Sequence, residues 1–165
     1  MDKMEFLKTK EILFSKLKPV LEENKGLAIF ARERAKFEGW LKVELVKILS
    51  NYFDNIIPEK NRIDITFEDW AIELKTINTN IRYKNVINKH RPITMNIDGV
   101  VSDIINLKLV NYTNKGIIFI AFPIEHNNPN WQLHLNKIKN KLIKLEYMEF
   151  RFSNKIPGVV YFGLI

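Results

Sequence analysis

The sequence predicts one mixed α/β domain in which helices flank a central mixed sheet. The chain has 165 residues, of which 46% are hydrophobic and 12% aromatic, which is enough for a single folded core. Segments with the helical period of about 3.6 residues alternate along the chain with short segments of strand length. One of these, Ile117–Ile124, is continuously apolar, which is typical of a strand buried on both faces. A mixed sheet covered by helices fits this order best.

The N-terminal part is predicted to be helical. Residues 3–17 form an amphipathic segment, Pro19 ends or kinks it, and Gly26 separates it from the next helix. Residues 27–50 carry the strongest helical signal, because apolar side chains recur on one stripe. The stripe residues are Phe30, Phe37, Trp40, Leu41 and Ile48. We interpret residues 1–25 as a helical extension, and the segment 3–17 within it could support a homodimer or cap the core.

A β-hairpin is predicted after these helices. Arg62–Phe67 and Trp70–Ile77 alternate as two strands, and Glu68-Asp69 is a two-residue turn between them. The elements that follow are a polar stretch 78–96, a helix 97–109, a strand 117–124, a helix 131–145 and strands 147–152 and 158–165. We expect residues 27–145 to form the core and residues 146–165 to add the C-terminal strands, so that residues 1–165 make a single domain.

The composition excludes several classes of protein and site. Cysteine is absent, which excludes disulfides and thiolate metal sites, and the three histidines show no ligand spacing. No apolar run approaches the roughly 18–20 residues needed to span a membrane, and no secretory signal is visible. We therefore expect a cytoplasmic protein without a membrane partner.

The excess positive charge lies in the C-terminal part of the chain. Residues 1–73 carry 13 Lys/Arg and 14 Asp/Glu, whereas residues 74–165 carry 13 against 5. This asymmetry suggests an anionic partner such as nucleic acid on one side of the molecule. The predicted contacts are the basic residues of the acid-free polar stretch, namely Arg82, Lys84, Lys89 and Arg91. An ordinary polar loop in a Lys- and Asn-rich chain remains the alternative.

The predicted hairpin brings two carboxylates together. With the turn at Glu68-Asp69, Asp64 lies directly opposite Glu73, and their Cβ atoms are roughly 4.5–5.5 Å apart. Two carboxylates so placed repel each other unless a hard divalent cation binds between them. Lys75 points to the same side as Glu73 and could neutralise the pair or orient a water molecule. The alternative is a solvated charged face of an edge strand.

A third carboxylate is predicted on the helix 27–50. At about 100° per residue, Glu44 falls on the apolar stripe, where a carboxylate is costly unless it is paired or binds metal. Glu38 lies roughly 120° around the helix and is a boundary residue. Glu44 is therefore the predicted third ligand, and a buried salt bridge from Glu44 to Lys75 or Arg62 is the alternative.

These residues resemble the PD-(D/E)xK nuclease superfamily, which has the restriction-endonuclease-like fold. The resemblance is carried by the helix sequence FEGWLKVEL, then by RID, and then by IELKT, in which the Glu of the motif follows the Asp by nine positions. It covers residues 27–77 most closely and extends, through the order of helices and strands, to about residue 145. It implies an αβββαβ core. One departure is that Ile63, and not a Pro, precedes Asp64.

The resemblance implies a catalytic set of Asp64, Glu73, Lys75 and Glu44. Asp64 and Glu73 would bind Mg²⁺, or Mn²⁺ as a substitute, together with the backbone carbonyl of Leu74, and Glu44 would contribute directly or through water. Lys75 would position or deprotonate the attacking water. The implied activity is metal-dependent hydrolysis of phosphodiesters by a DNA endonuclease of restriction, defence or repair. An RNA nuclease and a non-catalytic nucleic-acid-binding or scaffold domain are the alternatives.

Overall fold

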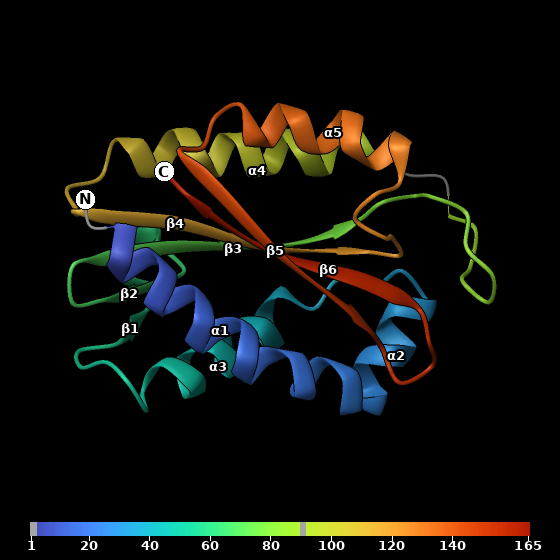
Figure 1. Cartoon of the computed structure of the whole chain (residues 1–165), viewed down its shortest axis with the longest axis horizontal. Coiled ribbons are helices and arrows are strands. Elements are labelled where there is room, and N and C mark those ends of the chain that lie inside the picture. Colours follow the sequence, from blue (N-terminus) through green and yellow to red (C-terminus); the bar gives the residue numbers. More distant parts are fainter. Residues whose placement is uncertain (1–2, 90–91) are drawn as a thin grey trace.

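The computed structural model describes residues 3–89 and 92–165, and in it two helical layers cover the two faces of one six-stranded sheet (Figure 1). The elements are α1 (Lys3–Glu23), α2 (Lys25–Arg32), α3 (Glu38–Leu49), β1 (Ile57–Pro58), the 3₁₀ turn η1 (Lys60–Arg62), β2 (Ile65–Phe67), β3 (Trp70–Asn78), α4 (Ile93–Lys108), β4 (Asn114–Phe122), α5 (Pro129–Lys139), β5 (Lys144–Arg151) and β6 (Pro157–Leu164). The strand order is β1-β2-β3-β4-β6-β5, and only β3 and β4 pair in parallel. The predicted mixed α/β class with a mixed central sheet is therefore confirmed.

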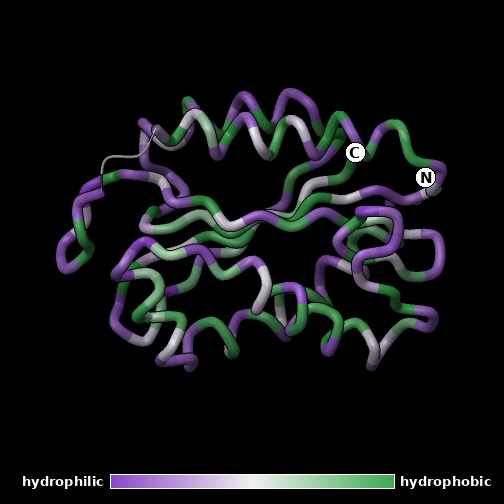
Figure 2. Tube along the Cα trace, turned by 180° about the vertical axis from the view of Figure 1, so that it is seen from behind, coloured by the Kyte–Doolittle hydropathy of each residue, from purple (hydrophilic) through white to green (hydrophobic). Residues whose placement is uncertain are grey.

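The sheet divides the core into two apolar layers, which Figure 2 shows on either side of the central strands. Strand β4 contributes to both layers, because successive side chains of a strand point to opposite faces. Ile118 and Ile120 pack with the α1–α3 layer, whereas Ile117 and Phe119 pack with α4 and α5. This two-sided burial is what the continuous apolar run predicted. No helix in the described part of the chain is long and apolar enough to cross a membrane.

Helix α1 does not end at Pro19, which was one of the two outcomes predicted for this proline. It continues to Glu23 with the proline inside it. Leu17 and Leu21, on either side of Pro19, are fully buried. Their packing offsets the loss of one backbone hydrogen bond that a proline imposes inside a helix. The apolar face of α1 thus caps the core, which is one of the two roles expected for it.

The predicted helix 27–50 is two helices, α2 and α3, separated by residues 33–37. The break depends on Arg34, which has the left-handed φ of 54° and is 5% exposed. Its guanidinium donates hydrogen bonds to Asn78 Oδ1 at 2.8 Å and to the carbonyls of Ile81 at 2.7 Å and Ile87 at 2.6 Å. These partners are distant in sequence. The residues 33–37 between the two helices include neither Gly nor Pro, so nothing local marks the break. It moves Glu38 to the first turn of α3.

The hairpin has the predicted register. Ile65 pairs with Ile72 and Phe67 with Trp70, and Glu68 in the turn between them has a φ of 47°. Strand β2 is shorter than predicted, since it begins at Ile65 and not at Arg62. Pairing therefore stops at Ile72, and the rest of β3 has no strand beside it on this side.

The largest boundary difference in the C-terminal part lies between α5 and β5. One helix was expected to continue to residue 145, but α5 ends at Lys139 and Leu145 lies in β5. Pairing of Lys144 with Leu164 and of Leu145 with Gly163 makes this segment a strand. From α3 to β4 the order is helix, three strands, helix, strand, as in the αβββαβ order that the resemblance implies.

Candidate active site

The candidate site lies along the open edge of β3, beyond the end of β2. Two carboxylates occupy this edge in place of a neighbouring strand. The Leu74 N–H donates to Asp64 Oδ2 at 2.8 Å, and the Thr76 N–H donates to Glu38 Oε1 at 3.0 Å. The N–H and C=O of one strand residue point to the same side, so the Leu74 carbonyl faces this edge as well. Sequence positions 38, 64 and 74–76 are thus joined at one short stretch of backbone.

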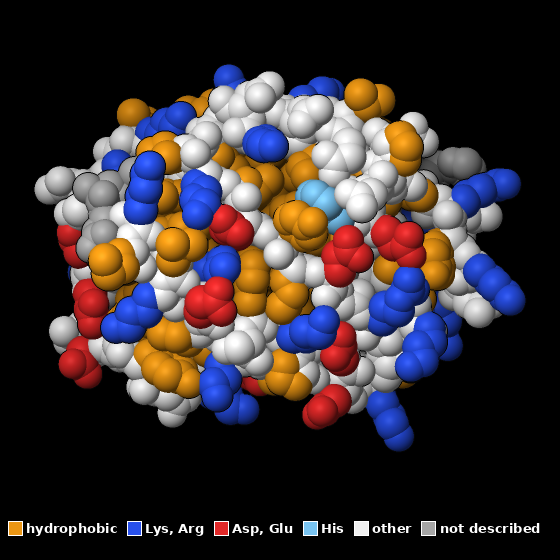
Figure 3. All heavy atoms as spheres, in the orientation of Figure 1, with side chains coloured by type: hydrophobic (Ala, Val, Ile, Leu, Met, Phe, Trp, Pro, Cys, Tyr) orange, Lys and Arg blue, Asp and Glu red, His pale blue; other side chains and the backbone are white. Residues whose placement is uncertain are grey.

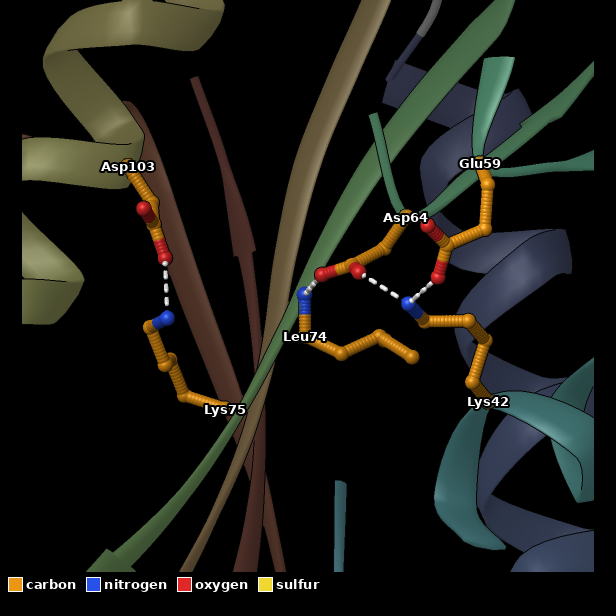
Figure 4. A network of polar contacts seen from close by, with 6 residues as sticks. All are labelled: Lys42, Glu59, Asp64, Leu74, Lys75 and Asp103. Atoms are coloured by element: carbon orange, nitrogen blue, oxygen red, sulfur yellow. Dashed lines mark hydrogen bonds and ion pairs between the residues drawn. The ribbon is translucent and has the colours of Figure 1, made fainter. Parts of the chain in front are cut away.

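Asp64 is fixed from two directions (Figure 4). Its Oδ2 accepts from Leu74, and its Oδ1 forms an ion pair with Lys42 Nζ at 2.6 Å. Glu59, in the turn before Asp64, also pairs with Lys42. Burial alone would raise the pKa of Asp64, but hydrogen bonds from Glu73, Lys42 and Leu74 outweigh it and hold the pKa below its usual value. Asp64 is therefore the ionised member of the site.

Glu73 is the partner of Asp64 in the pair that the sequence predicted. Burial, the hydrogen bond to Asp64 and the nearby negative charges raise the pKa of Glu73 to about 9, while the same interaction lowers the pKa of Asp64. Near neutral pH the pair therefore holds one proton, on Glu73. Such opposite shifts are expected of two adjacent carboxyls that repel each other when both are ionised.

Lys75 points to the α4 side of the sheet, as does Glu73, and meets Asp103 there. Its Nζ lies 3.1 Å from Asp103 Oδ2 (Figure 4). Burial lowers the pKa of Lys75, but the hydrogen bond and charge of Asp103 outweigh it, and the pKa is raised. Burial raises the pKa of Asp103, and the hydrogen bond and positive charge of Lys75 only partly offset this increase.

Sequence reasoning missed two residues at the site, Lys42 and Asp103. Each had a signal in the helical spacing. Lys42 follows Glu38 by four residues and therefore lies on the same face of α3. Asp103 follows Val100 by three residues and precedes Leu107 by four, so it lies on the buried stripe of α4. An acid on an apolar stripe was the criterion that selected Glu44, and it applies to Asp103 equally.

Glu44 is not at the candidate site, and Glu38 takes the place predicted for it. Glu44 lies 3.5 Å from Lys47 and lines a pocket that also contains Lys16 and Val20 of α1. The prediction ranked Glu44 first because it falls on the apolar stripe. Both residues lie in α3, where Glu38 stands in the first turn next to β3, while Glu44 lies beside α1.

Replacing each of the two helix carboxylates with glutamine should show which of them belongs to the site. Glu38→Gln should lower the rate of metal-dependent cleavage by about 10–100-fold, the usual cost of losing a group that orients a metal site. Glu44→Gln, the matched control on the same helix, should leave the rate unchanged. Steady-state cleavage by both variants, with melting curves to verify folding, measures the difference. A larger loss in the Glu44 variant would restore the original assignment.

The predicted nucleic-acid contacts lie on the loop between β3 and α4. Arg82, Lys84 and Lys89 are exposed there, and Lys89 Nζ donates to the Glu33 carbonyl at 3.0 Å. Arg91, the fourth predicted contact, lies outside the described residues. Figure 3 shows Lys and Arg side chains projecting from the end of the molecule where Figure 1 places this loop. The three bonds from Arg34 attach the loop to the connection between α2 and α3.

The residues at the β3 edge fit a Mg²⁺ ion by the chemistry of their donors. Within residues 3–89 and 92–165, no three His, Cys, Asp or Glu side chains converge on one point to form a complete metal site. Mg²⁺ does not need such a set, because it binds through one or two carboxylates and keeps several water ligands. Asp64 and Glu73 supply two carboxylates, and the shared proton marks a place where a cation would relieve their repulsion.

Comparison of the chain with protein-family models, with curated proteins and with solved structures gives no match.

Proposed function

We propose that this protein is a Mg²⁺-dependent nuclease that hydrolyses phosphodiester bonds of DNA, as an endonuclease of restriction, defence or repair in the cytoplasm. The observation that carries the proposal is the pair Asp64 and Glu73 at the open edge of β3, with Lys75 two residues farther along the strand. A structural ion-pair network has no need of two carboxyls that compete for one proton. The αβββαβ order from α3 to β4 supports the same proposal.

Each residue has a role that follows from its position. Asp64 and Glu73, with the Leu74 carbonyl, would hold Mg²⁺ or Mn²⁺, which when bound acidifies a water and neutralises charge on the phosphate. Lys75, on the Glu73 side of the strand, would orient the attacking water as an ammonium that donates a hydrogen bond. Glu38, which accepts the Thr76 N–H, would contribute its negative charge to the metal site through a water molecule. Lys42 holds the Asp64 carboxylate in place before the ion arrives.

Nuclease assays test the proposal directly. The purified protein is incubated with single- and double-stranded DNA and RNA, with Mg²⁺, Mn²⁺ or a chelator. Cleavage of DNA that requires either metal supports the proposal, whereas cleavage of RNA alone would change the substrate. Metal-independent nucleic-acid binding without cleavage would instead support the alternative of a non-catalytic binding or scaffold domain.

The loop between β3 and α4 should account for much of the salt dependence of DNA binding. Replacing Arg82 and Lys84 together with Ala should reduce the slope of log K against log salt concentration by up to about 2, because each lost phosphate contact removes roughly one unit. Binding titrations in chelator at several salt concentrations give the slope. The control replaces Lys3 and Lys8, exposed on α1 at the other end of the molecule (Figure 1). Equal changes in both double variants would show that the loop is not the contact surface.

A further inference from the structure

The Lys75 side chain packs against two residues of α4 that are one helical turn apart. Gly99 is the first of them, and a Cβ there would stand 3.8 Å from Lys75 Cε. Asp103 is the second, with Oδ2 buried and 3.1 Å from Lys75 Nζ. The lysine stem thus runs past Gly99, and Asp103 pairs with its charged end. Both side chains of the ion pair are mostly buried, 29% and 21% exposed, so the geometry is well defined.

Other carboxylates interact electrostatically with the Lys75 ammonium. The negative charges of Asp64 and Glu38 act on Lys75, and its positive charge acts on Glu73. Without Asp103, the ammonium would be free to turn to Glu73, which is on the same face of β3. A Lys75 bound to Glu73 would compete with the metal for that carboxylate, because both satisfy the same negative charge.

We propose that Asp103 is a positioning residue that holds Lys75 away from Glu73. It leaves Glu73 without a lysine partner, so that this carboxyl can bind a divalent cation, and it keeps the ammonium beside the place of the attacking water. Asp64 keeps its separate ion pair with Lys42. Asp103 therefore acts through Lys75 and is not itself a ligand of the metal. This inference rests on the proposed metal-dependent function of the same site.

A double-mutant cycle on Mn²⁺ binding tests the inference. Asp103→Asn keeps the shape of the side chain but releases Lys75, so Mn²⁺ affinity should fall by about tenfold, within the usual range for coupled neighbours. Lys75→Met removes the competing ammonium, so its affinity should equal or exceed that of the wild type. In the Lys75→Met background, Asp103→Asn should cause no further loss. Calorimetric titration of Mn²⁺ into the four proteins, without nucleic acid, gives the four affinities.

Three outcomes decide between the accounts. A tenfold loss in the Lys75→Met background as well would make Asp103 a ligand and overturn the positioning role. Wild-type affinity in Asp103→Asn would overturn it too, while leaving the proposed function intact. A wild type that binds no Mn²⁺ would overturn the proposed function itself.

Controls separate positioning from folding. Asp98→Asn, an exposed acid on the same helix, should leave Mn²⁺ affinity unchanged. Asp103→Glu keeps the charge and should restore affinity, which a purely structural role of the aspartate shape would not produce. Asp103→Ser serves as a second uncharged variant should the Asn protein unfold. In cleavage assays at saturating metal, Asp103→Asn should lower kcat and leave the KM for DNA unchanged, because Lys75 is then misplaced but the basic loop is not.

Discussion

Asp64→Asn is expected to abolish both Mn²⁺ binding and cleavage in a protein that remains folded. The asparagine oxygen can still accept the Leu74 N–H that Asp64 Oδ2 accepts at 2.8 Å, so the edge of β3 keeps its shape. The lost charge is what a divalent cation requires. Lys42 then keeps its ion pair with Glu59 but loses the one with Asp64, which leaves more positive charge beside the site. The loss of cleavage should exceed the ~10²–10³-fold that follows removal of one charge-stabilising group.

The measurement combines calorimetry with Mn²⁺, cleavage of the preferred DNA and a melting curve for each protein. Asp54→Asn is the matched control, since Asp54 is an exposed aspartate in the connection before the hairpin. It should bind metal and cleave as the wild type does. A folded Asp64→Asn protein that still cleaves DNA at the wild-type rate would show that the chemistry lies elsewhere on the molecule.

The hairpin and its carboxylate pair could be predicted from the sequence, because both follow from local rules. A two-residue turn at Glu68-Asp69 sets the pairing of every strand residue after it, and the observed pairs Ile65–Ile72 and Phe67–Trp70 obey it. That register placed Asp64 and Glu73 together. The late start of β2 at Ile65 was not predictable in the same way, yet it is what opens the β3 edge to both carboxylates.

The helix carboxylate at the β3 edge is Glu38, and helical periodicity could not select it over Glu44. Both residues lie in α3, so the break at Arg34 does not change the angle between them. Periodicity does not say which face of α3 meets β3 and which meets α1, because tertiary packing decides this. Asp103 was missed for a related reason, since its partner Lys75 comes from another element and only the packing of α4 on β3 brings the two together.

Glu73→Gln is expected to raise the stability of the metal-free protein at alkaline pH while removing metal binding. The folded-state pKa of Glu73 is raised from 4.5 to about 9, so the folded protein binds more protons than the unfolded chain between these values. The stability of the wild type should therefore fall as pH rises through this window. Glutamine is neutral throughout, and its amide can donate to Asp64 as the protonated carboxyl does. The melting temperature of the variant should exceed that of the wild type increasingly from pH 5 to pH 9, taken as about the limits of the window.

Asp64 does not obscure this trend, because its pKa is lowered rather than raised. Its effect on stability therefore has the opposite dependence on pH and falls in a more acidic range. The stability that it contributes is present above its unfolded value of 3.8 and is lost only in more acidic solution. Mn²⁺ should reverse the ranking of the two proteins, since binding displaces the proton of Glu73 and stabilises only the wild type, with an affinity that rises with pH. Melting curves across the pH range, with Mn²⁺ and with chelator, measure both effects. If the chelated proteins differ by a constant amount at every pH, Glu73 does not carry the shared proton, and the electrostatic basis for a cation at this edge of β3 is lost.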